Sequence, residues 1–170
     1  MKNLYLYILT LTFILVSCVS QPDRAYTSSG KPEVLTSVPI EIIKDEVIRI
    51  FVEDAWVITN DSKYSTTMTK PCGDGFGCIM GQALIGNSYS TPPQMEISFS
   101  WIKTNNGSKV LVSRYDMSTQ MAFGQINRQT LLGNNTNFNQ LVDLLNRVKR
   151  NIEEDNLMLI EDEEDENQSI

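Results

Sequence analysis

The 170-residue sequence contains no histidine. Without histidine there is no Ser-His-Asp or Cys-His arrangement for nucleophilic catalysis and no imidazole to act as a general base. Carboxylates could still transfer protons, but here they lie at an expected helix end, in an expected turn or at polar positions of expected strands, where solvation or ion pairing is the simpler explanation. These acids are Glu53, Asp54, Asp61, Glu96 and Asp116. We therefore predict that the protein is not an enzyme and has no catalytic residues, cofactor or metal site.

An excess of basic residues is also missing. The chain has 14 Lys and Arg against 21 Asp and Glu, and its net charge is −7. Residues 18–152 are nearly neutral, with 12 acids and 13 bases, whereas nine acids lie between Glu153 and Glu166. Such a body does not fit a phosphate backbone, so we exclude nucleic acids as partners. The segment 154–170 lacks aromatic residues and is predicted to be an acidic, disordered tail, which also suits loose cation binding or a basic partner.

No apolar run in the sequence is long enough to cross a bilayer comfortably. The longest one extends from Leu4 to Val16, with Thr10 and Thr12 as its only polar members. As a helix it would span roughly 18 Å, whereas the hydrocarbon core of a bilayer is roughly 30 Å thick. A positive start at Lys2 followed by a short apolar core is typical of a secretory signal peptide, which we assign to residues 1–17.

The end of this run, Leu15-Val16-Ser17-Cys18, resembles the lipobox of bacterial lipoproteins. The resemblance implies that the thiol of Cys18 carries a diacylglyceryl group and that the signal peptide is cut before it. Two or three acyl chains anchor a protein firmly, since each buried methylene contributes about 0.8 kcal/mol. Val19 follows, in place of the Asp that resembles an inner-membrane retention signal, which favours the outer membrane facing the periplasm over the inner membrane. The alternative is an ordinary signal peptide with an incidental cysteine.

The stretch "PCGDGFGC" contains the other two cysteines, Cys72 and Cys78. It lacks the Lys-Ser/Thr ending of a phosphate-binding loop and the strand and helix context of a dinucleotide site. Five residues separate the cysteines, whereas a redox-active pair usually has two between them, and two cysteines alone form no zinc site. Because exported thiols pair, we predict a structural Cys72–Cys78 disulfide that contributes about 2 kcal/mol.

The first helix is expected over residues 38–54. Ser37 can cap it, and Pro39 suits its first turn, where a missing N–H has no cost. One face then collects apolar residues at steps of three and four, namely Ile40, Ile43, Val47, Ile50 and Phe51.

A second helix is expected over residues 137–153. Asn137 and Gln140 resemble a capping box at its start, and basic residues near its end complement the helix dipole. Its apolar stripe consists of Phe138, Leu141, Leu145, Val148 and Ile152.

Strands are expected between these helices. "AWVIT" and "YSTTMT" are rich in aromatic and β-branched residues and are joined by a turn signal, "NDSK". "MEISFSWIK" alternates apolar and polar residues, and "TNNGS" then predicts a hairpin to "KVLVSRYDM". The apolar face of the alternating strand carries Met95, Ile97, Phe99 and Trp101. Residues 118–132 fit either a further strand or a loop.

Together these elements predict an α+β domain over residues 37–153, with an antiparallel sheet of about four strands and the two helices packed on one face. This order resembles the small α-β-β-β-β-α domains of several envelope lipoproteins, including the helix-grip kind, and implies no function. Residues 18–36 mix Pro, Ser, Gly and Thr and are expected to be a flexible tether.

Two hypotheses for function follow. The first is a lipid-anchored, non-catalytic interaction or accessory module of the cell envelope, whose partners are the membrane, through Cys18, and an unidentified envelope protein. The second is a carrier or sensor of an apolar ligand in a pocket between the sheet and the helices. Aromatic residues that could line such a pocket, or simply fill the core, are Trp56, Phe99, Trp101, Tyr115 and Phe123. A cavity of several hundred cubic ångströms would favour the second hypothesis.

Overall fold

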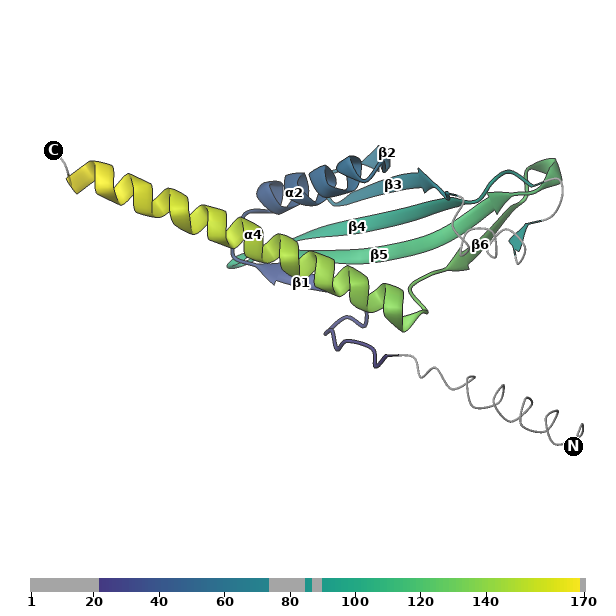
Figure 1. Ribbon diagram of the computed structural model, residues 1–170, viewed down its shortest axis with the longest axis horizontal. Coiled ribbons are helices and arrows are strands. Elements are labelled where there is room, and N and C mark those ends of the chain that lie inside the picture. Colours follow the sequence, from purple (N-terminus) through teal and green to yellow (C-terminus); the bar gives the residue numbers. More distant parts are fainter. Residues whose placement is uncertain (1–21, 74–84, 87–89, 169–170) are drawn as a thin grey trace, which may run out of the picture.

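The computed structural model describes residues 22–73, 85–86 and 90–168, with side chains up to residue 155. It confirms an α+β fold with two helices and an antiparallel sheet, but the sheet has six strands and not about four (Figure 1). The elements in chain order are β1 (Glu33–Thr36), α2 (Ile40–Glu53), β2 (Val57–Asp61), β3 (Ser65–Pro71), β4 (Gln94–Thr104), β5 (Gly107–Gln120), the 3₁₀ turn η1 (Ala122–Gly124), β6 (Ile126–Thr130) and α4 (Asn135–Gln168).

The sheet is built around β5. The strand order is β1-β5-β4-β3-β2, and β6 also pairs with β5. β1 pairs with residues 108–111 of β5 and β6 with residues 116–120, so these two short strands share one edge of the same long strand. The predicted hairpin between β4 and β5 is confirmed. Its Gly107 has a φ of 134°, and a Cβ there would lie 2.1 Å from the Thr36 carbonyl oxygen, so no other residue fits.

The core lies between one face of the sheet and both helices. Ile97, Phe99 and Trp101 of β4 are fully or almost fully buried there, as their alternation predicts. Val110 and Val112 of β5 extend the same face. The helices supply their apolar stripes to this core and contact each other, and Figure 1 shows them side by side across the strands.

The start of α2 differs from the prediction. The helix begins at Ile40, with Pro39 at the N-cap position and no side-chain capping bond. Ser37 does not cap it: its backbone N–H and hydroxyl both donate to a carboxylate oxygen of Glu153, at 3.2 and 3.3 Å, and the Thr36 hydroxyl donates to the same oxygen at 2.9 Å. Ser37 therefore joins α4 to the β1–α2 connection.

Both ends of α4 also differ from the prediction. The cap is Asn134 and not Asn137, because the Asn134 side-chain oxygen accepts from the backbone N–H groups of Thr136 and Asn137, at 2.8 and 3.2 Å. The helix continues to Gln168, well beyond the expected end near 153, and its backbone is helical over most of the segment expected to be a disordered tail. This segment has no Gly or Pro, and extending an existing helix avoids the cost of nucleation.

The segment 18–36, which the sequence predicts to be a flexible tether, includes a strand of the sheet. Residues 33–36 are β1, and the residues before them lie against α4. The Asn139 side chain accepts from the Ala25 N–H at 2.8 Å and donates to the Asp23 carbonyl at 2.8 Å. The Arg24 guanidinium lies 3.8 Å from the ring centroid of buried Phe138. Backbone hydrogen bonding and burial, which composition does not reveal, order this segment.

Candidate binding pocket

A pocket of about 430 Å³ opens between the sheet, the end of α2 and the first turns of α4. This volume lies within the roughly 300–1,000 Å³ range of small-ligand sites. Apolar and aromatic side chains come from the sheet and from both helices, and polar ones lie among them. The lining residues are Phe51, Asp54, Trp56, Ile97, Tyr115, Asn137, Gln140, Leu141, Leu144 and Arg147.

The end of α2 places Trp56 in this pocket. The Trp56 N–H donates to the Phe51 carbonyl at 3.0 Å, and the Ala55 N–H donates to the Val52 carbonyl at 3.0 Å, which together form a Schellman motif. The motif requires a left-handed residue, and Ala55 supplies it with a φ of 61°. Across the motif the Phe51 and Trp56 rings meet edge to face, 5.5 Å apart. The chain reversal thus makes an aromatic wall.

Asp54 gives this wall a polar rim. One of its carboxylate oxygens lies 2.9 Å from the Lys70 ammonium on β3 and accepts from the Trp56 indole N–H at 3.2 Å. The lysine therefore offsets the charge of Asp54, and the carboxylate fixes the indole ring. A ligand in the pocket meets a balanced ion pair at this end.

Tyr115 of β5 forms another part of the wall. Its ring centroid lies 6.4 Å from that of Trp56, and its hydroxyl lies 3.9 Å from the sulfur of Met95. Burial, and secondarily the nearby charge of Asp54, raises the pKa of the Tyr115 hydroxyl. The residue therefore stays protonated at neutral pH and offers a neutral hydroxyl among apolar neighbours.

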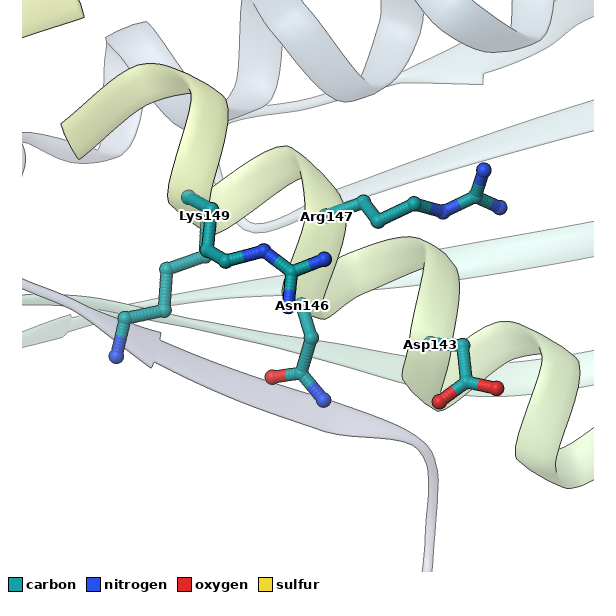
Figure 2. A pocket seen from close by; sticks show the side chains of 5 residues that line it. Asp143, Asn146, Arg147 and Lys149 are labelled. Atoms are coloured by element: carbon teal, nitrogen blue, oxygen red, sulfur yellow. The ribbon is translucent and has the colours of Figure 1, made fainter. Parts of the chain in front are cut away.

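α4 contributes the remaining wall, where amide groups and one cation stand beside leucines. The Asn137 amide donates to the Leu131 carbonyl at 3.3 Å, which holds it at the start of the helix. Arg147 also borders an outer hollow of about 420 Å³ on α4, with Asp143, Asn146, Lys149 and Arg150. Figure 2 shows the Arg147 side chain extending away from those of Asn146 and Lys149. Among the described side chains, no ion pair includes Arg147.

The aromatic residues named from the sequence divide into three groups. Trp56 and Tyr115 line the pocket. Phe99 and Trp101 are core residues, and the buried indole N–H of Trp101 donates to the Thr66 hydroxyl at 2.9 Å. Phe123 belongs neither to the pocket lining nor to the core, because its side chain is fully exposed in η1, where its φ is 71°. The structure therefore brings together only part of the proposed aromatic set.

The acids considered for proton transfer are all paired with bases. Glu53 and Asp54 lie 2.6 and 2.9 Å from Arg49 and Lys70, and Asp61 lies 2.8 Å from Lys44. Glu96 and Asp116 share Arg114, at 2.7 and 3.7 Å, on the sheet face opposite the core. In the part of the chain that the structure describes, no group of three or more Cys, Asp or Glu side chains is arranged to hold a metal ion.

The predicted lipidation and disulfide sites are described only in part. Cys72 follows β3 directly, and its N–H donates to the Pro93 carbonyl at 2.9 Å. Cys18 and Cys78 lie outside the described residues. Lipidation of Cys18 and the pairing of Cys72 with Cys78 therefore stay predictions.

Sequence reasoning missed the polar part of the pocket. Arg147 is one of the basic residues that the sequence places near the end of the second expected helix, where they complement its dipole, and Asn137 is the expected cap, because both roles depend on local sequence alone. Asn137 and Arg147 line the same pocket as Trp56 and Tyr115 because of the way α4 crosses the sheet. No signal in the sequence encodes that crossing directly.

No described protein family, curated protein sequence or solved structure matches this chain. Within the described residues, no helix is both long and apolar enough to cross a membrane. The lining of the pocket suits a small molecule that has an apolar body and a polar or anionic end.

Proposed function

We propose that the protein is a lipid-anchored, non-catalytic binding protein of the cell envelope that carries or senses a small amphipathic ligand. The pocket between the sheet, α2 and α4 is the observation that supports this function. It meets the size criterion for a ligand site, and aromatic side chains from α2, the turn that follows it and β5 converge on it. Cys18 holds the protein at the membrane, where an amphipathic ligand is most concentrated.

The lining defines the ligand class. Half-buried Leu144 and the exposed edges of Phe51 and Trp56, which are 7% and 6% exposed, offer a small apolar surface to a hydrocarbon or ring system. Arg147 stands at the α4 side as a cation outside the described ion pairs, so a carboxylate or sulfonate on the ligand could pair with it. The ligand is thus an amphiphile with one anionic end.

Binding of a fluorescent anilinonaphthalene sulfonate, with dodecanoate as competitor, tests this proposal. The mature chain without its lipid contains every described residue and avoids detergent. Replacing Arg147 with Gln should weaken dodecanoate binding about tenfold or more, because a hydrogen bond to a charged group is worth roughly 1.5–3 kcal/mol. The same change at Arg150, which borders only the outer hollow, is the matched control and should leave affinity unchanged.

Two results would contradict the proposal. Equal losses in Arg147→Gln and Arg150→Gln would indicate non-specific charge attraction to α4. Saturable dye binding that dodecanoate does not displace would indicate a surface site other than the pocket.

A second function, an interaction module for an envelope protein, is favoured by the edge strand β2. All five residues of β2 are exposed, including Val57 and Ile58, and in the described sheet its outer edge has no neighbouring strand. Exposed apolar edges invite pairing with a strand of another chain. A Lys in place of Val57 should abolish capture of an envelope partner by crosslinking in cells, and should leave dodecanoate binding intact.

A further inference from the structure

The domain begins very close to the lipidation site. Pro22 is already held in the fold, because the Asn135 side chain of α4 donates to its carbonyl at 3.1 Å. An extended chain advances at most about 3.5 Å per residue, so the Cα atoms of Cys18 and Pro22 lie within about 14 Å of each other. A lipidated Cys18 sits at the headgroup level of the membrane. The end of the domain that carries Pro22 is therefore held next to the lipid surface.

Several contacts fix the orientation of this end. Asn139 binds the backbone on both sides of Arg24 through two hydrogen bonds of 2.8 Å. The Lys31 ammonium donates to the Ser113 carbonyl at 3.3 Å, and Glu33 pairs with Lys109 at 2.7 Å. Because only residues 19–21 separate Cys18 from the first of these contacts, at Pro22, the lipid anchor restricts the rotation of the domain as well as its distance from the membrane.

The surface presented by this segment suits lipid headgroups. Tyr26 is 94% exposed, although it directly follows Ala25, whose N–H is bound to Asn139 of α4. Tyrosine rings with one apolar and one polar end gather at the membrane–water interface. The first turn of α4 beside it presents the uncharged Asn135 and Thr136.

The charge of α4 supports the same orientation. The acids from Glu153 to Glu166 begin roughly 27 Å along the helix from Asn135, at 1.5 Å per residue. Figure 1 shows that this end of α4 extends past the sheet and past α2. Anionic lipids repel acidic residues, so the acidic end is most stable away from the surface.

We propose that residues 22–29 and the first turn of α4 form a membrane-facing surface, with Tyr26 among the headgroups of the bilayer that holds Cys18. This inference rests on the lipid anchor of the proposed function. It adds a defined orientation, in which the start of α4 meets the membrane and the opposite edge of the sheet points away.

Tryptophan quenching in vesicles tests this orientation. The lipidated chain is inserted into vesicles of phosphatidylethanolamine and phosphatidylglycerol whose acyl chains are brominated near the headgroups. The native Trp56 and Trp101 are buried, so the emission added by a surface tryptophan is measured against the unsubstituted protein. The added emission of Tyr26→Trp should fall by a factor of about two or more, because the ring lies at the headgroup level. Tyr64→Trp, 69% exposed beside β3 near the far edge of the sheet, should be almost unquenched.

The possible failures are distinguishable. If the protein floats with the vesicles but Tyr26→Trp is unquenched, or both positions are quenched equally, the orientation is wrong and the anchor stands. If the protein does not float, both the anchor and this inference are wrong. Asn139→Ala removes the two hydrogen bonds that hold residues 23–25 against α4, so it should reduce the difference in quenching between Tyr26→Trp and Tyr64→Trp. Asn146→Ala changes an exposed residue further along α4 and should leave this difference in quenching unchanged. If Asn139→Ala leaves the difference in quenching unchanged, the hydrogen bonds of Asn139 do not set the orientation of the domain.

Discussion

Ala55 adopts a left-handed backbone conformation at the point where α2 ends and the chain turns into the pocket. A β-carbon in this conformation costs roughly 1–2 kcal/mol, which glycine avoids. Glycine also loses more entropy on folding, which offsets part of the gain. We therefore expect Ala55→Gly to raise the free energy of unfolding by about 0.5–1 kcal/mol in a urea titration.

Ala25 provides the control for this change, since its φ is not positive. There the same substitution should lower stability by a few tenths of a kcal/mol, because only the entropic effect remains. A loss of stability in Ala55→Gly would mean that the left-handed turn is not formed in solution.

Individual core residues were predictable, whereas pocket residues mostly were not. Phe99 and Trp101 alternate with serines along one strand, and alternation alone places them in the core. Trp56 enters the pocket because of a left-handed alanine, which no propensity favours. Arg147 reaches it only because two helices pack across the same sheet face.

At the scale of elements, the start of α4 depends on one side chain. The Asn134 oxygen accepts from two backbone N–H groups of the first turn, which would otherwise lack partners in the helix. We expect Asn134→Ala to lower the free energy of unfolding by about 1 kcal/mol. Thermal and urea unfolding measure this loss.

Asn151 is the matched position within the same helix. Its side chain is exposed in a helix interior, where alanine has the higher propensity, so Asn151→Ala should be neutral or slightly stabilising. If the two variants lose equal stability, asparagine removal in general, and not capping, would explain the effect.

The elements that were predicted correctly carry their own periodic signal. α2, β4, β5 and the first turns of α4 show apolar residues at the steps their structure requires, and β2 and β3 follow from β-branched residues on either side of a turn signal. β1 was missed, and residues 118–132, which contain β6, fitted either a strand or a loop, because these strands have four and five residues and form only by pairing with β5. A strand this short is defined by the strand with which it pairs, and the local sequence does not identify that partner.

At the scale of the whole molecule, the attachment of the N-terminal segment depends on pH. Burial by itself would raise the pKa of Glu33, but hydrogen bonds from Lys109 and Ser28 outweigh it and lower the pKa from 4.5 to about 2. The charged form is thus favoured in the folded state. The stabilisation is complete above about pH 4.5 and disappears as the pH falls towards 2.

We therefore expect the unfolding free energy of the wild type to fall by on the order of 1 kcal/mol more than that of Glu33→Gln across this range. Urea titrations at several pH values between these limits measure the difference. Glu154→Gln, an exposed position on α4, should follow the wild-type profile. Identical profiles for wild type and Glu33→Gln would show that this carboxylate does not hold the segment in place.

The position of β1 in the sheet has a consequence for the order of folding. From β2 to β6, each strand pairs with its neighbour in the chain. The loops after β2, β4 and β5 are short, and even the longer connection between β3 and β4, residues 72–93, is shorter than the loop that β1 closes, so these pairings are expected to form earlier. β1 pairs with β5 across all of α2 and three strands, so it closes the longest loop and joins late. The amino-terminal strand is therefore expected to join the sheet after the other strands have paired. If Cys18 is lipidated as we propose, the enzymes that acylate and cleave there would act before β1 pairs with β5.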